Sequence, residues 1–189
     1  NFKYKLEFKN TVILNLSVMN DQVNLLYPTS FANAVPLPAG HYGYTYGMVD
    51  FFTDSRKSVA GAIGGNFGSF YNGTIRSVRA MLTLRSRPHV NVSVMGEYDM
   101  LQFPGIYGKG ELLLISPKIE INFTTTLSWT TFMQYNTQAN NFNINSRFQY
   151  RFRPMSDIYL VYTDNYFTDP MLKNRNRSLV FKMNYWLNL

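Results

Sequence analysis

The chain has 189 residues and no cysteine, carries a formal net charge of +7, and is 46% hydrophobic and 16% aromatic. This composition is too rich in large apolar side chains for a disordered segment, and the length suits one domain. The lack of cysteine excludes disulfide scaffolds and thiolate metal sites. No apolar run approaches the roughly 20 residues that a membrane-spanning helix needs, so helical membrane proteins are excluded as well.

Alternation of apolar and polar side chains dominates the chain and predicts β-strands. From Phe2 to Met19 the even positions are mostly apolar and the odd positions mostly polar, which predicts one very long strand. The same template predicts about ten strands: 2–19, 41–53, 58–70, 74–86, 89–101, 110–123, 127–136, 142–153, 157–166 and 178–189. Several reach the roughly 9–11 residues with which a tilted strand crosses a bilayer.

Short turns and longer connections alternate between these strands. Residues typical of turns predict tight connections at 53–57, 86–88, 123–126 and 153–157. The alternate connections are 20–40, 102–109, 136–141 and 167–177, together with a short hairpin at Asn72-Gly73. Short turns at one end and longer loops at the other are typical of transmembrane β-barrels. An even strand count would place both ends of the chain on the short-turn, periplasmic side.

Aromatic side chains gather near the predicted strand ends. Tyr and Trp favour the boundary between hydrocarbon and headgroups, where the apolar ring and the polar tip are both satisfied. We therefore predict two aromatic belts, with Tyr42, Tyr44, Tyr46, Tyr135 and Tyr166 at the loop ends and Trp129, Tyr185 and Trp186 at the turn ends. Alternation also fits a soluble β-barrel or sandwich that encloses a small apolar ligand, and that alternative stays open.

Basic residues recur on the predicted polar faces. They are Arg79, Arg85, Arg147, Arg151, Arg153 and Lys182, whereas carboxylates at inward positions are few, Glu7 and Glu97 among them. In a water-filled barrel, such a wall favours anionic solutes. The alternative is a hydrated wall without selectivity. The basic residues form no run, so the charge gives little support to a nucleic-acid partner.

Candidate chemistry is sparse. His41 and His89 are the two histidines, and the predicted topology places them at opposite ends, so an outer-membrane enzyme would depend on His41 and a nearby serine. Carboxylates beside two loops, Glu97, Asp99 and Glu111 and then Asp164 and Asp169, would serve a divalent cation or a cation-bridged lipopolysaccharide. Solvated loop charges are the simpler interpretation, and we expect no catalytic, metal or cofactor site.

Segments 1–10, 36–42, 68–74, 134–138, 146–157, 160–165 and 179–186 occur in an order that resembles the C-terminal region of a family of uncharacterised outer-membrane proteins of Bacteroidetes. The resemblance implies a long chain in which a carbohydrate-binding-like β-sandwich precedes a membrane barrel of more than ten strands. Residues 1–189 would then be a single barrel region, the C-terminal portion of that chain. The family offers no catalytic motif.

In the last predicted strand, 178–189, Leu179, Phe181, Met183, Tyr185 and Leu187 keep the apolar alternation that barrel-assembly machinery recognises, and Leu189 stands where an aromatic residue is usual. We therefore predict an integral, porin-like barrel of the bacterial outer membrane with both ends periplasmic. It would act as a pore, a scaffold or a subunit of an envelope complex. Its expected partners are outer-membrane lipid, lipopolysaccharide and other outer-membrane subunits, and not nucleic acid.

Overall fold

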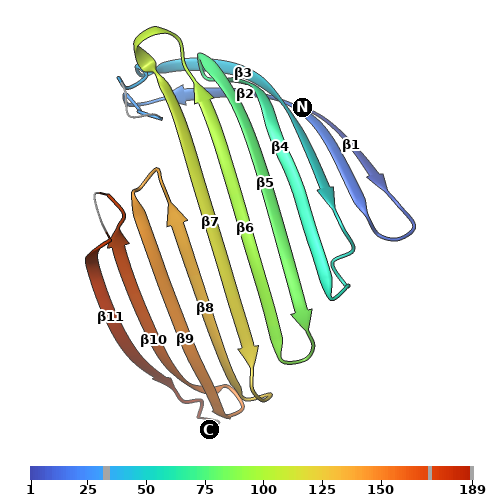
Figure 1. Ribbon diagram of the computed structural model, residues 1–189, viewed down its shortest axis with the longest axis vertical. Helices are drawn as coiled ribbons and strands as arrows, with labels where there is room; N and C mark the ends of the chain where they lie inside the picture. The colour runs from blue at the N-terminus through green and yellow to red at the C-terminus, as the bar shows by residue number, and fades with distance from the viewer. Residues whose placement is uncertain (32–34, 170–171, 188–189) are drawn as a thin grey trace. The chain divides into compact units, whose positions relative to one another are not determined.

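The computed structural model describes residues 1–31, 35–169 and 172–187. These residues form eleven β-strands, whose order in a single sheet follows the chain from β1 to β11 (Figure 1). The predicted antiparallel all-β class is confirmed. Because the order begins with β1 and ends with β11, the sheet formed by the described residues is open, with these two strands as its edges.

The strand bounds agree closely with the sequence prediction over most of the chain. The eight strands predicted between residues 41 and 166 all occur, with ends within one residue of those expected. The elements are β1 Phe2–Glu7, β2 Ile13–Leu25, β3 Gly40–Phe52, β4 Val59–Phe70, β5 Gly73–Ser86, β6 Val90–Gln102, the 3-10 helix η1 Gly105–Tyr107, β7 Lys109–Asn122, β8 Leu127–Asn136, β9 Asn141–Arg153, β10 Ser156–Phe167 and β11 Lys173–Asn184.

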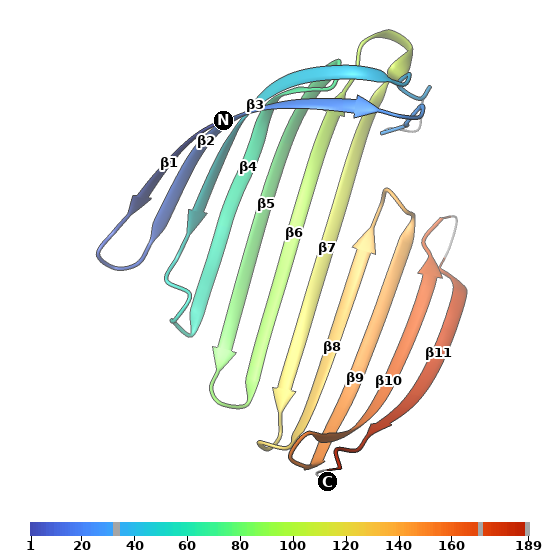
Figure 2. The ribbon, with the colours of Figure 1, turned by 180° about the vertical axis from the view of Figure 1, so that it is seen from behind.

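The predicted long strand 2–19 is wrong, because the chain turns between β1 and β2 (Figure 2). The amide of Phe8 donates to the carbonyl of Val12 at 2.9 Å, and Thr11 adopts a φ of 62°. The turn pairs even-numbered residues with even-numbered residues: Leu6 opposes Leu14 and Phe2 opposes Val18. Apolar residues therefore stay on one face through the hairpin. Alternation therefore continues unbroken across the turn and conceals it.

The last strand is displaced from its prediction. β11 begins at Lys173 and ends at Asn184, whereas 178–189 was expected. Residues 185–187 follow the strand without joining the sheet. Positions 188 and 189 of the predicted strand, where Leu189 was singled out, lie outside the described residues. In the overlap of the predicted strand 178–189 with β11, Leu179, Phe181 and Met183 lie on one face of the strand.

An odd strand count changes the expected direction of the chain. Neighbouring strands run antiparallel, so with eleven of them the chain enters β1 at the end that carries the longer loops and leaves β11 at the end that carries the short turns. The even count that placed both ends at the short turns is therefore wrong for the described sheet.

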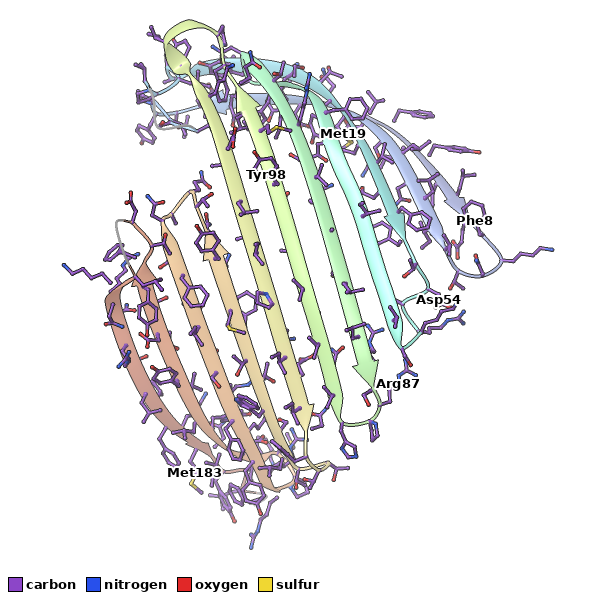
Figure 3. The ribbon with its side chains drawn as sticks, viewed as in Figure 1. Phe8, Met19, Asp54, Arg87, Tyr98 and Met183 are labelled. Carbon is purple, nitrogen blue, oxygen red and sulfur yellow. The ribbon has the colours of Figure 1, made fainter. Side chains whose placement is uncertain are left out.

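The short turns occur where they were predicted, and the β1–β2 turn joins them; Phe8, Asp54 and Arg87 mark three of the five (Figure 3). In the β3–β4 turn, the Arg56 side chain donates to both carboxylate oxygens of Asp54, at 2.9 and 3.0 Å. These hydrogen bonds hold the pKa of the Asp54 carboxyl well below its usual range. The longer connections are 26–39, 103–108, 137–140 and 168–172, with the two-residue hairpin at 71–72.

The chain divides into two compact units. The first contains residues 1–56, 60–81 and 96–113, and the second contains 57–59, 82–95 and 114–189. Within the described ranges, no helix has the length and apolar character needed to cross a membrane.

A glycine on β4 permits the close approach of β3. Gly68 has a φ of +146°, and a Cβ there would lie 2.6 Å from the Tyr46 Cα and 2.7 Å from the Thr45 carbonyl oxygen. We expect Gly68→Ala to lower the free energy of unfolding by more than about 1 kcal/mol, since both the backbone conformation and the space exclude a side chain. Urea unfolding of the two proteins measures this.

Gly96→Ala is the matched control, because a Cβ at Gly96 meets nothing within 4 Å. It should be neutral or slightly stabilising. Equal losses for the two variants would contradict the packing of β3 on β4.

Candidate functional site

The exposed and buried residues are distributed in reverse of the usual soluble pattern. On β5, Ser77 and Thr83 are 5% and 6% exposed, whereas Val78 and Leu84, on the other face of the same strand, are 54% and 45% exposed. Of the described hydrophobic side chains only five are buried: Leu37, Tyr44, Ala60, Leu101 and Phe103. The candidate functional site is therefore the sheet itself, with an exposed apolar face and a more sheltered polar face.

In the first unit, the strand registers define both faces. The apolar face pairs Tyr4 with Leu16, Leu16 with Val49, and Phe51 with Ile63. Phe67 opposes Gly47, and its ring lies over the glycine, where a Cβ would come within 2.8 Å. Small residues leave an apolar hollow of about 440 Å³ on this face, lined by Phe2, Leu16, Ser17, Val18, Thr45, Tyr46, Gly47, Met48, Val49, Phe67 and Gly68.

In the second unit, the two faces separate in the same way. Trp129 opposes Phe148, which opposes Leu160, which in turn opposes Phe181. The other face pairs polar side chains, as where Gln134 opposes Asn143 and Asn145 opposes Thr163. Asn145 also donates to the Thr163 hydroxyl at 2.9 Å. One apolar and one polar surface thus extend across β8, β9, β10 and β11.

Three of the predicted belt tyrosines lie on the polar face. Tyr42, Tyr44 and Tyr46 share a face with Asp50 on β3, and the Tyr46 hydroxyl donates to Asp21 at 3.1 Å. A belt in contact with lipid requires the opposite face. These three tyrosines therefore do not belong to a lipid-facing belt as the structure places them.

These tyrosines instead belong to an aromatic cluster at the loop end of the first unit. Tyr44 lies 5.2 Å from Tyr71 and 5.6 Å from Phe70 between ring centroids. Leu37, Leu101 and Phe103 form the buried centre beside Phe31 and Phe70. Within the connection 26–39, an isolated β-bridge pairs Thr29 with Leu37. The sequence analysis missed this cluster because it identified 20–40 only as a longer connection, and no local pattern indicates what that connection packs against.

The other predicted belt residues lie at strand ends, and two of them face apolar neighbours. Trp129 lies near the turn end of β8 and donates to the Ser146 hydroxyl at 2.7 Å. Tyr135 opposes Phe142 at the loop end, and Tyr166 also opposes Phe142. Tyr185 and Trp186 follow β11 at the turn end, where they are exposed. Trp129, Tyr135 and Tyr166 thus share the apolar face near the strand ends, and the polar atoms of Trp129 and Tyr166 bond to Ser146 and Asp164 on that face.

The polar face of the first unit pairs its central arginine with carboxylates. The Arg79 Nη2 lies 3.1 Å from Asp50 Oδ1 and 3.1 Å from Asn66 Oδ1, and Nη1 lies 3.9 Å from Glu97 Oε1. Asp21, Glu97 and Asp99 add further negative charge to this unit. The positive charge of Arg79 is therefore neutralised by the neighbouring carboxylates, and Arg79 adds no net positive charge to this face.

The predicted basic residues of the second unit differ in their surroundings. Arg151 pairs with Asp157 at 3.1 Å, and Arg153 donates to the Tyr185 hydroxyl at 3.0 Å. Arg85 donates to the Lys57 carbonyl at 3.3 Å.

The other two predicted basic residues face uncharged partners across the strands. Arg147 opposes Thr130 and Val161, and Lys182 opposes Tyr159. The charge of Arg147 also acts on Glu120. Lys118, absent from the predicted set, pairs with Glu120 at 2.7 Å.

The candidate catalytic and metal groups are not assembled. The His89 Nδ1 lies 2.8 Å from the Asn122 carbonyl oxygen, and His41 is exposed on β3. Glu111 accepts a hydrogen bond from Tyr98 at 2.8 Å. Among residues 1–31, 35–169 and 172–187, no three His, Asp or Glu side chains gather as a metal site would require.

Comparison with protein-family models, with curated proteins and with solved structures finds no match for this chain.

The Arg79 pairing can be tested by removal of its charge. Arg79→Gln should lower the free energy of unfolding by about 1–3 kcal/mol, because Asp50 loses a charge-assisted hydrogen bond in a half-buried setting. Arg76→Gln on the exposed face of β5 is the control, and should change it by less than about 0.5 kcal/mol. Urea titration of the three proteins provides the measurement, and equal losses would show that Arg79 holds no special contact.

Proposed function

We propose that this chain is part of an integral β-barrel of the bacterial outer membrane and forms its structural wall. The observation that carries this proposal is the reversed burial on β5, where Val78 and Leu84 are exposed while Ser77 and Thr83 are sheltered. A sheet in lipid must satisfy every backbone hydrogen bond internally and present apolar side chains outward. The aromatic residues at the strand ends, Trp129, Tyr135 and Tyr166, fit the same arrangement.

The soluble alternative fits this distribution less well. A soluble barrel with an apolar interior would shelter the apolar face of each strand from solvent. The more sheltered face of β5 is instead the polar one. The apolar hollow of about 440 Å³ lies on the exposed face, where lipid acyl chains would fill it in the proposed setting.

Two of the six predicted basic residues, and Lys118 in addition, pair with carboxylates, which favours a structural or weakly selective wall over a strongly anion-selective pore. Arg79 pairs with Asp50, Arg151 with Asp157 and Lys118 with Glu120. Selectivity for anions needs a wall whose positive charge is not cancelled. The proposed role is thus a scaffold, or a subunit of an envelope complex with other outer-membrane proteins. The resemblance to a Bacteroidetes outer-membrane family is in keeping with this proposal.

Closure of the barrel requires strands beyond those described. In an eleven-stranded antiparallel sheet, β1 and β11 run in the same direction. Bacterial single-chain barrels have even strand numbers and close through antiparallel neighbours. We therefore propose that an odd number of further strands lies between β1 and β11, so that the full barrel has at least twelve.

Adjacent residues on opposite faces of β5 test the membrane setting. Leu82 and Met81 are similarly exposed, at 47% and 43%, but face opposite sides of the strand. If lipid covers the apolar face, Leu82→Arg should cost about 2–4 kcal/mol of folding free energy in vesicles. Met81→Arg on the polar face should cost less than about 1 kcal/mol.

Urea unfolding in lipid vesicles measures both variants, and membrane fractionation of the parent protein accompanies it. If water instead covered this face, Leu82→Arg would change the folding free energy little. A folded parent protein in the detergent-free soluble fraction, or equal costs at the two positions, would contradict the membrane proposal.

Engineered cysteine pairs test the closure, since the chain has no cysteine of its own. In the full-length protein, pairs that combine positions 3 or 5 on β1 with 178, 180 or 182 on β11 should form no disulfide. Closure by further strands separates them beyond the roughly 7 Å limit between Cα atoms. A pair at Lys5 and Asn15, which oppose each other in the β1–β2 hairpin, is the positive control. A β1–β11 disulfide would indicate direct pairing of these strands.

A further inference from the structure

A buried carboxylate interrupts the apolar face of β10. Asp164 is 1% exposed and opposes Ile144 on β9 and Arg177 on β11. It lies on the same face as Leu160 and near the loop end of its strand. A buried carboxylate is stable only when donors replace the water that it loses, so its partners explain why it is tolerated there.

Four side chains supply these donors. The hydroxyls of Tyr162 and Tyr166 donate to Asp164 Oδ2 at 2.6 and 2.7 Å, and Asn174 donates to Oδ1 at 2.5 Å. The Arg177 Nε donates to Oδ2 at 2.8 Å. Because both oxygens are engaged by protein donors, Asp164 is poorly placed to bind the divalent cation that its position beside a loop had suggested.

This network fixes the guanidinium of Arg177. Its Nη2 lies 2.8 Å from Asp164 Oδ2 and 3.2 Å from the Tyr166 hydroxyl, so one edge of the group is held against the sheet. The side chain is nevertheless 56% exposed. A guanidinium has five N–H donors, and those of Nη1 have no acceptor among the described side chains. A planar group held in this way is pre-organised for a phosphate, which accepts parallel hydrogen bonds.

Additional positive charge lies at the same end of β11. Lys173 and Arg175 precede Arg177 in a five-residue stretch that contains no carboxylate. Lys173 opposes Phe167, which shares a face of β10 with Thr163, so the register places Lys173 on the polar face, opposite to Arg177. The Arg175 guanidinium lies 5.2 Å from the Phe167 ring centroid. Asp164 neutralises Arg177, and Asp169 lies in the preceding connection. The three cations still exceed these two carboxylates, so the loop end of β11 carries a net positive charge.

Apolar side chains continue directly from this cationic end. Leu179, Phe181 and Met183 lie on the same face of β11 as Arg177, because their partners on β10 are Tyr162, Leu160 and Ile158. They are 67%, 66% and 54% exposed. A cation followed along one strand by an apolar ladder matches the order of headgroup and acyl chain in a lipid.

We infer that the loop end of β10 and β11 binds the phosphate of an anionic lipid in the outer leaflet, with lipid A as the fitting class. Arg177 holds the phosphate, and Asp164 is the positioning residue that orients the guanidinium. The acyl chains lie along Leu179 and Phe181. This inference rests on the proposed membrane function and assigns a specific lipid site to it.

The test uses the full-length protein in a neutral detergent, with binding of diphosphorylated lipid A measured by native mass spectrometry. Arg177→Gln should weaken binding about tenfold, the order expected for loss of a charge-assisted contact. Lys182→Gln removes the same charge from the opposite face of β11 and should change binding less than about twofold. Monophosphorylated lipid A should bind the parent protein more weakly, and inorganic phosphate at millimolar concentration should not compete.

A second variant covers the case in which Arg177→Gln fails to fold around an unpaired Asp164. Arg177→Lys keeps a cation beside Asp164 but removes the planar guanidinium, and should still weaken binding several-fold, while Arg147→Lys on the polar face of β9 should not. Equal binding by the parent protein and the two Arg177 variants would overturn the lipid site, as would competition by inorganic phosphate. If the parent protein partitions into membranes in that case, only the site fails. If it is soluble, the membrane proposal fails as well.

Discussion

The antiparallel ladder of backbone hydrogen bonds is the constraint on which the rest of this structure depends. Side chains alternate strictly along a strand, so a slip of one residue in the pairing of two strands would exchange their faces. The registers keep the two faces apart in β1–β4 and in β8–β11, with irregularities only at Ser156/Asp157 and Asn165/Tyr166 near the strand ends. Tyr4 meets Leu16 on one face while Lys5 meets Asn15 on the other, and Phe148 meets Leu160 while Gln149 meets Tyr159. Two chemically distinct surfaces follow directly from this pairing.

The same ladder determines which charges meet on the polar face. Asp50 and Arg79 are 29 residues apart in the chain, yet their side chains are 3.1 Å apart. Arg151 and Asp157, in contrast, are joined across the short β9–β10 turn. Since Arg79 and Arg151 each draw a carboxylate from another strand, net charge in the sequence is a poor guide to charge at the surface. The +7 of the chain is therefore compatible with a polar face that is largely neutralised at its centre.

Two features depart from simple alternation, and each has a local physical cause. Tyr44 is buried on the polar face because the connection 26–39 returns to it, bringing Leu37 and Phe31 against Phe70. Asp164 lies on the apolar face because Tyr162, Tyr166, Asn174 and Arg177 satisfy its oxygens. Departures of this kind tend to mark functional positions, and the second of them is where we propose that a lipid phosphate binds.

The sequence alone determined the strands from β3 to β10, their faces and their short turns, because alternation and turn chemistry are local properties. The β1–β2 turn was hidden because even-numbered residues lie on the same face before and after it. Asn10 is a residue type that favours turns, and its side chain accepts a hydrogen bond from the Val12 amide at 3.4 Å. The odd strand count, the partners of Arg79 and the placement of Tyr42, Tyr44 and Tyr46 were decided only by the tertiary structure. These depend on register and loop packing between distant segments, which no local pattern encodes.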